Sequence, residues 1–109
     1  MARDNSKAQD LLGKGAEAHQ AGQFDKAEKF YKRALKADSN NADALHLLGL
    51  ISHQKGRDEY AAQLIGKALA IKPSEPAINT NMAIVLNTLQ RWPEAERAAI
   101  AAIKAVPEH

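Results

Sequence analysis

The segment ADALHLLGLISHQKGRDEYAAQLIGKALAIKPSE, residues 42–75, is the middle one of three related segments in this chain of 109 residues. A shift of one segment length aligns it with residues 8–41 in one direction and with residues 76–109 in the other. The columns that align best hold small side chains: Ala27, Ala61 and Ala95, and then Ala34, Ala68 and Ala102. Such a period is typical of stacked supersecondary units, which bury their apolar faces against one another. The sequence therefore predicts one domain, residues 1–109, built from three repeats.

Each repeat contains two apolar patterns with helical spacing, separated by a turn. In the first repeat Tyr31 and Leu35 lie four residues apart on one face of the second pattern. Gly22 and Gly56 follow the first pattern of their repeats and can take the left-handed conformation that ends a helix, and Gln90 stands at the same place in the third. The sequence predicts six helices, at residues 7–21, 25–37, 41–55, 58–71, 76–89 and 93–106.

These repeats resemble the tetratricopeptide repeat family. The second repeat carries the apolar, small and turn residues of the family pattern in order: Leu45, Leu48, Gly49, Gly56, Ala61, Ala68 and Pro73. The resemblance covers residues 8–109 and implies an all-α fold, a right-handed superhelix of three helix-turn-helix repeats and six helices. It also implies that the first helix of each repeat lines a concave groove, and that the small residues mark close helix crossings.

Three polar residues bear on the ends and the packing of these helices. Asn40 and Ser74 precede predicted helices, and we expect their side chains to cap them. Asn79 departs from the repeat pattern, because Leu11 and Leu45 stand at the same place in the other two repeats. The sequence offers no packing reason for an amide there.

By the resemblance, the residues that face the groove are apolar or polar without charge. Ala16, Leu50 and Ile84 would form its central strip, and such a strip is typical of a site that binds an extended segment or a helix of a partner protein. The alternative is that Leu50 and Ile84 only pack against neighbouring helices. The predicted peptide-binding residues are Leu12, Ala16, His19, His46, Leu47, Leu50, His53, Asn81, Ile84 and Asn87.

Three of these residues are histidines on one predicted face. His19 and His53 are one repeat apart, and His46 lies about two helical turns before His53. A zinc site needs three or four converging ligands. We therefore interpret the histidines as polar lining of the groove rather than as a metal or pH-sensing cluster, and expect neither a metal nor a cofactor.

Family members that bind chaperone tails hold a terminal carboxylate with lysine, asparagine and arginine side chains from three first helices. The matching positions in this sequence are Leu12, Ala16, Leu47, Ala77 and Asn81. None of them carries a positive charge that could pair with a carboxylate. We therefore expect no affinity for acidic chaperone tails.

The sequence shows no motif for catalysis, for a membrane or for nucleic acid. It contains no glycine-rich phosphate loop, no HExxH and no G-x-S-x-G, so we expect no enzyme activity. No apolar run approaches the roughly 18 residues of a membrane span, and the first residues lack the apolar stretch of a secretory signal. A cytoplasmic location is therefore expected. The net charge of +2 is too small to favour nucleic acid as a partner.

The predicted helix at residues 25–37 carries five lysine and arginine residues. We interpret them as a solvated face, because Asp25 and Glu28 are interleaved with them; an acidic partner is the alternative interpretation.

The last predicted helix presents Ile100, Ile103 and Val106 with no following repeat to cover them. Because a solenoid needs a polar terminal face, we expect either self-association through these residues or a longer parent protein.

Residues 44–76 are also similar to the N-terminal repeats of bacterial multidomain transferases, including relatives of the O-linked N-acetylglucosaminyltransferases. Three functions therefore stay open at this stage. The chain could be a protein-interaction module, the substrate-recruiting part of a bacterial glycosyl-, methyl- or sulfotransferase, or a module for homo-oligomerisation.

Overall fold

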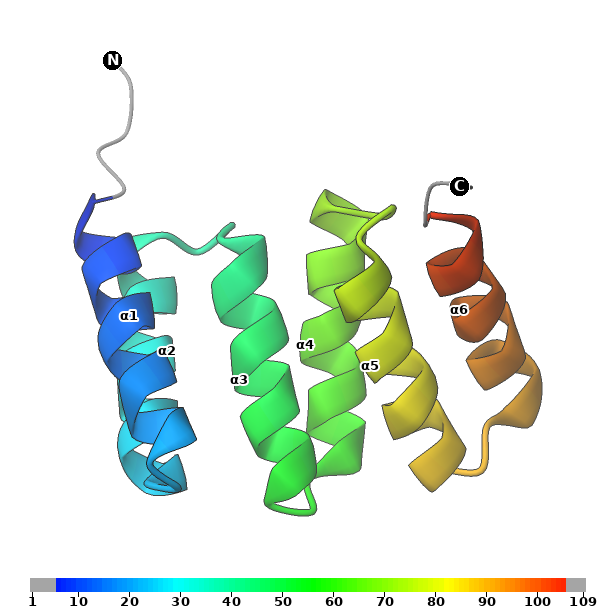
Figure 1. The fold of residues 1–109 in the computed structure, drawn as a ribbon, viewed down its shortest axis with the longest axis horizontal. Coiled ribbons are helices and arrows are strands. Elements are labelled where there is room, and N and C mark those ends of the chain that lie inside the picture. Colours follow the sequence, from blue (N-terminus) through cyan, green and yellow to red (C-terminus); the bar gives the residue numbers. More distant parts are fainter. Residues whose placement is uncertain (1–5, 106–109) are drawn as a thin grey trace.

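The computed structural model describes residues 6–105, which form six α-helices and, within that range, no strand (Figure 1). The helices are α1 (Ser6–Gln20), α2 (Phe24–Ala37), α3 (Ala42–Gln54), α4 (Asp58–Ile71), α5 (Pro76–Thr88) and α6 (Trp92–Lys104). The predicted all-α fold is confirmed, and each described helix end lies within two residues of its expected place.

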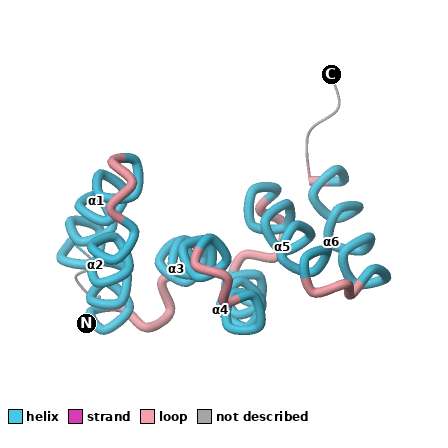
Figure 2. The backbone as a smooth tube through the Cα atoms, turned by 90° about the horizontal axis from the view of Figure 1, so that it is seen from below, coloured by secondary structure: helices cyan, strands magenta, loops and turns pink. Residues whose placement is uncertain are grey.

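Consecutive helices form three pairs that follow one another along the molecule (Figures 1 and 2). Within each pair the helices pack against one another, as α1 with α2, α3 with α4 and α5 with α6. Between pairs, α2 packs against α3 and α4 packs against α5, and α3 also contacts α5. This arrangement is the predicted right-handed superhelix of three helix-turn-helix repeats.

The turn inside each pair depends on one residue with a positive φ angle. Gly22 and Gly56 have φ angles of 76° and 79°, and Gln90 adopts 60° at the same place in the third repeat. The amide that follows this residue donates to a carbonyl five positions earlier, which closes the end of the helix. Glycine takes this conformation freely, whereas a residue with a Cβ atom is strained by about 1 kcal/mol.

Both expected caps fall one residue away from the predicted position. Asn41 rather than Asn40 caps α3, and its side-chain oxygen accepts a hydrogen bond from the amide of Ala44 at 2.9 Å. At α5 the N-cap position is Glu75 rather than Ser74, and no side-chain hydrogen bond caps the helix there.

Asn79 stabilises the connection between α4 and α5. Its side chain is only 5% exposed, and its Nδ2 donates to the carbonyl oxygens of Pro73 at 3.0 Å and Glu75 at 3.3 Å. The amide therefore satisfies two carbonyls of the connecting segment, which a leucine at this position could not do.

The core is divided into two clusters of buried side chains. The larger cluster extends from Leu11 in α1 to Val85 in α5, and Tyr31 and Ile65 lie in it with no exposed surface. The smaller cluster, between α5 and α6, consists of Ala83, Leu86, Ala95 and Ala98. Large apolar side chains are thus concentrated in the first cluster, while α6 is held mainly by alanines.

Charged residues cross the joint between the first and second repeats. Glu28 is 9% exposed, and its carboxylate accepts hydrogen bonds from Arg57 at 2.9 Å and from Lys55 at 3.4 Å. Lys55 also pairs with Asp25. The two carboxylates of α2 therefore bind the turn of the next repeat and do not interact mainly with the lysines that flank them in the sequence.

Candidate functional site

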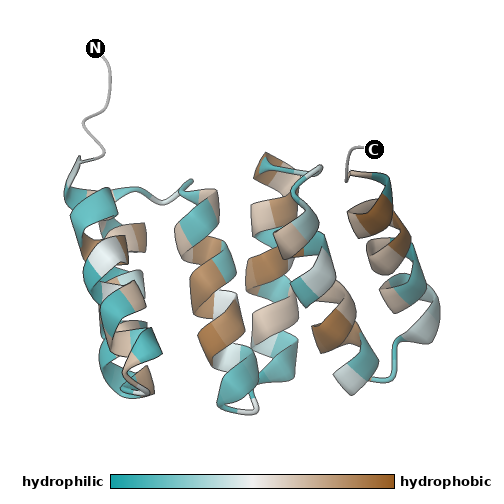
Figure 3. Cartoon of the chain, in the orientation of Figure 1, coloured by the Kyte–Doolittle hydropathy of each residue, from teal (hydrophilic) through white to brown (hydrophobic). Residues whose placement is uncertain are grey.

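One side of α1, α3 and α5 carries the predicted strip of apolar residues. We call this surface the A-helix face and define it by Ala16, Leu50 and Ile84, which occupy the same position in the three first helices. Ala16 and Leu50 are half-buried, and Ile84 is 45% exposed. Figure 3 shows hydrophobic residues along α3 and α5, whereas α1 is more hydrophilic in the same view. The strip thus presents most apolar surface at its α5 end.

The two leucines predicted beside this strip are more buried than Ile84. Leu47 is half-buried and packs against the larger core cluster. Leu12 belongs to that cluster and is only 7% exposed. Leu12 therefore packs in the core beneath the A-helix face and offers little surface to a ligand.

A hydrogen bond between His46 and Asn81 links α3 to α5 across the A-helix face. Asn81 Nδ2 lies 2.7 Å from His46 Nε2. Because an amide nitrogen can only donate, the imidazole Nε2 is the acceptor and carries no proton. Burial lowers the pKa of His46, and the charge of Asp43 is a weaker, opposing influence. The structure thus favours a neutral His46.

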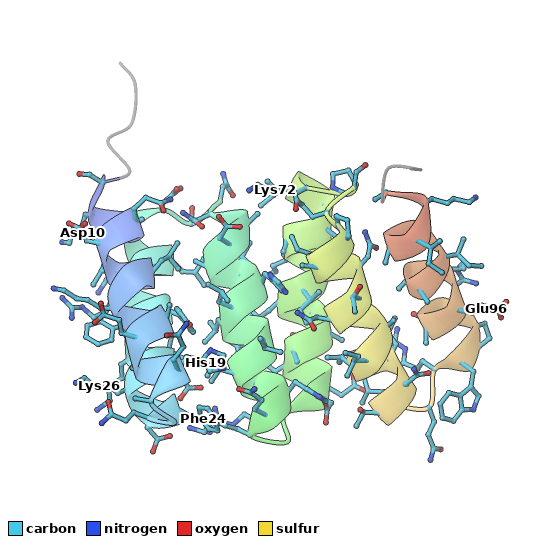
Figure 4. All side chains as sticks on the ribbon, viewed as in Figure 1. Asp10, His19, Phe24, Lys26, Lys72 and Glu96 are labelled. Atoms are coloured by element: carbon cyan, nitrogen blue, oxygen red, sulfur yellow. The ribbon has the colours of Figure 1, made fainter. Side chains whose placement is uncertain are left out.

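His19 connects helices of two different repeats. Its Nε2 donates to Gln54 Oε1 at 2.9 Å, so its Nδ1 is free to accept from the Tyr31 hydroxyl at 3.3 Å. Burial raises the pKa of the Tyr31 hydroxyl, which therefore keeps the proton that it donates. The ring of Phe24 lies edge-on to the imidazole, with 5.6 Å between the ring centres (Figure 4).

His53 pairs with Asp58 at the start of α4, within its own repeat. The three histidines that share a face in the sequence therefore bind three different neighbours. In the part of the chain that the structure describes, no three His, Cys, Asp or Glu side chains lie together as metal ligands would. Asn87, the last predicted residue of this face, is exposed.

Three surface hollows lie outside the A-helix face, and sequence reasoning did not find them. The first two, of about 390 and 310 Å³, lie on α1 and α2 and include Lys14, Lys26, Arg33 and Lys36 in their linings. The third, of about 490 Å³, lies between the α3–α4 and α5–α6 turns, where Tyr60 faces it. Each hollow is lined by residues of two helices or two turns, and the spacing of residues in the sequence does not give the distance between those elements.

Two of the three residues predicted for self-association lie on α6. Ile103 is 73% exposed and Ile100 is 43% exposed. Val106, the third residue of that prediction, lies outside the described residues. Between residues 6 and 105 none of the helices is both long enough and apolar enough for a transmembrane segment.

Comparison with known proteins identifies the family. The sequence profile of the tetratricopeptide repeat matches residues 12–76, more than half of the chain. The human protein O-mannosyl-transferase TMTC1 is 36% identical over 76 residues, which are 70% of this chain and 8% of that protein. The chain therefore spans a small part of this curated relative.

Two solved structures show how closely the fold is shared. A mutant O-GlcNAc transferase of Thermobaculum terrenum matches with a TM-score of 0.92 at 28% identity, covering 100% of this chain and 21% of that chain. The first repeat domain of Spaghetti (RPAP3), bound to the HSP90 peptide SRMEEVD, matches with a TM-score of 0.91 at 21% identity, covering 97% and 84%. With its three helix pairs, its aligned small residues and this profile match, the chain belongs to the tetratricopeptide repeat family.

Proposed function

We propose that this chain is a protein-interaction module that binds a peptide or a helix of a partner protein on the A-helix face. The observation that carries the proposal is the strip of Ala16, Leu50 and Ile84, which stays accessible although α3 and α5 pack against neighbouring repeats. Apolar side chains of a partner would be removed from water on this strip, at about 25 cal/mol for each Å² buried.

Polar groups beside the strip suit the backbone of such a partner. Asn81 uses its Nδ2 on His46, which leaves its Oδ1 to accept from a ligand amide. Gln54 uses its Oε1 on His19, which leaves its Nε2 to donate to a ligand carbonyl. Because both side chains are held by a histidine, little rotamer freedom is lost when they bind.

Similar folds have been solved with peptides, among them the domain of Spaghetti with SRMEEVD. That likeness supports a binding role and does not extend to the same peptide, since the strip of Ala16, Leu50 and Ile84 carries no charge to pair with an acidic peptide. Under the proposal the chain binds its partner and does not catalyse a reaction.

The test uses two isoleucines with almost the same exposure on different faces. Ile84 lies on the A-helix face and is 45% exposed, whereas Ile71 lies at the end of α4 and is 44% exposed. Wild type, Ile84→Arg and Ile71→Arg are each used to select binders from a displayed peptide library. We expect wild type and Ile71→Arg to enrich the same sequences and Ile84→Arg to lose them.

Equal recovery by all three proteins would place binding elsewhere and overturn the proposal. Equal loss in both variants would also overturn it, provided that circular dichroism shows both to be folded. Leu50→Arg, at the centre of the strip, provides an independent second variant.

We also propose a second function, in which this module recruits substrates for a transferase domain of a larger protein. The supporting observation is the 28% identity to the Thermobaculum terrenum O-GlcNAc transferase along the whole of this chain. The complete reading frame provides the test. A transferase domain in frame on either side of this segment would support this function, and a gene that encodes no such domain on either side would overturn it.

A further inference from the structure

The outer face of α6 has the same residue pattern as the α2 side of the joint between the first and second repeats. In α2, Glu28 binds Lys55 and Arg57 of the next repeat, and Leu35 lies two turns further along the same face, packed against the core. In α6 the equivalent positions are Glu96 and Ile103. This face of α6 therefore carries a carboxylate and an apolar residue with the spacing of an internal joint.

No repeat covers these residues in the described part of the chain. Ile103 is 73% exposed, whereas its equivalents Leu35 and Leu69 are half-buried. Glu96 is exposed and points away from the rest of the molecule (Figure 4). Ile100, one turn before Ile103, is 43% exposed and enlarges the apolar surface. A partner for this face needs an apolar surface with a positive charge beside it.

The opposite end of the array does not fit this face. At the positions where α3 buries Ala44, Leu48 and Ile51, α1 carries charged and exposed side chains: Asp10, Lys14 and Glu17. Head-to-tail stacking of α6 on the α1 of another copy would bury these three charges against isoleucine. Such burial is strongly unfavourable without matching partners, so the array does not extend by end-to-end stacking.

We propose that two copies of this chain associate through their α6 helices, which pack antiparallel about a two-fold axis. Ile100 lies midway between Glu96 and Lys104, four residues from each, and both charged residues are exposed. In an antiparallel pair centred on Ile100, Glu96 of one copy lies level with Lys104 of the other. A parallel pair would instead place like charges level with one another.

The two-fold arrangement repeats each contact and closes the assembly at two copies. It combines the apolar surface of Ile100 and Ile103 with two Glu96–Lys104 pairs. One helix from each copy offers less area than the roughly 800 Å² per partner of a stable interface, so the dimer is weak and reversible. It presents two A-helix faces, which increases avidity for a partner with two binding segments.

Sedimentation over a range of protein concentrations tests this association. We expect the mass to rise from the 11.8 kDa of one chain towards twice that value. Ile100→Glu should raise the dissociation constant of the dimer by about tenfold or more, since it places two carboxylates side by side at the two-fold axis. Ile71→Glu, which changes an exposed isoleucine on α4, should leave the constant unchanged. A constant mass of one chain up to about 1 mM would overturn the proposal.

A charge exchange tests the antiparallel geometry. Glu96→Lys and Lys104→Glu each place like charges level in their own homodimer, so each variant alone should dimerise about tenfold more weakly. An equal mixture of the two variants restores both opposite-charge pairs, and its dissociation constant should return to that of wild type. Wild-type dimerisation without rescue in the mixture would overturn the antiparallel pairing. Thermal melting followed by circular dichroism confirms that each variant is folded.

Discussion

Gly15 of α1 faces the ring of Tyr31 in α2 so closely that a Cβ atom added at Gly15 would lie 2.7 Å from Tyr31 Cδ1. Tyr31 has no exposed surface, so its ring has no room to move aside. The second repeat has the same relationship, because a Cβ atom at Gly49 would lie 2.6 Å from Ile65 Cγ1. The family's small residue is therefore a steric requirement of the helix crossing.

The third repeat meets this requirement in a different way. At the same two positions it has Ala83 and Ala99, so the second helix contributes a small side chain where the first two repeats contribute Tyr31 and Ile65. In the third repeat the first helix therefore has alanine instead of glycine, and the second helix has alanine instead of tyrosine or isoleucine. The crossing tolerates alanine on one helix when the facing residue is also small.

We expect Gly15→Ala to destabilise the protein by about 1–2 kcal/mol, since overpacking outweighs the better helix propensity of alanine. Gly13→Ala in the same helix is the matched control, because a Cβ atom there would have no neighbour within 4 Å. That control should stabilise the protein by up to about 1 kcal/mol. Urea denaturation measures both changes, and effects of the same sign would contradict the steric argument.

Gln90→Gly should stabilise the protein by about 0.5–1 kcal/mol. Gln90 holds a φ angle of 60°, at the place where the other repeats have glycine. Glycine removes the strain of this conformation, although it also increases the entropy of the unfolded chain. The same substitution inside α4, Gln63→Gly, should destabilise by about 1 kcal/mol. If the midpoint of thermal unfolding falls in both variants, the left-handed turn is not strained.

His46 should make the stability of the fold sensitive to acid. Its folded-state pKa lies below the usual value of 6.5 because burial disfavours the charged imidazole. Between the two pKa values the unfolded chain binds more protons, so stability present above pH 6.5 is lost as the pH falls below it. Protonation of Nε2 also removes the acceptor for Asn81.

The measurement is the free energy of unfolding in urea between about pH 7.5 and pH 5, for wild type and His46→Gln. Glutamine can accept from Asn81 and does not titrate, so the variant should lose less stability than wild type on acidification. Parallel pH curves would show that His46 is not responsible.

The HSP90 peptide SRMEEVD, which is bound in the Spaghetti structure, should not bind this chain. By the family resemblance, the positions expected to hold a terminal carboxylate are Leu12, Ala16, Leu47, Ala77 and Asn81. They provide no cation for the terminal carboxylate. Calorimetry should show no heat of binding up to about 100 µM peptide, with the Spaghetti domain as the positive control. Tight binding would contradict this reading of the A-helix face.

The period of the sequence was sufficient to predict the six helices and their order. Turn chemistry placed the turns correctly, since Gly22 and Gly56 adopt positive φ angles. The caps were wrong by one residue, because Asn40 and Asn41 are equally good capping residues and the exact start of the helix decides between them. Local propensity therefore identified the elements but not their terminal hydrogen bonds.

Contacts between repeats could not be predicted from spacing alone. Glu28 lies among lysines in the sequence, yet its carboxylate reaches Arg57 and Lys55 in the next repeat. Asn79 interrupts an apolar column because two carbonyls of a connecting segment lie beside it. Both contacts depend on where a neighbouring turn lies in space, and the repeat pattern carries no information about that position.

Because the core is divided into two clusters, one end of the array is expected to unfold before the other. The alanine-rich cluster around α6 contains fewer and smaller apolar side chains than the cluster that joins α1 to α5, so α6 can open while the rest stays folded. Amide hydrogens of α6 would then exchange with solvent before those of α3 and α4. The helix that offers the most exposed apolar surface is thus also the least firmly anchored, and a second molecule bound to it would suppress this local opening.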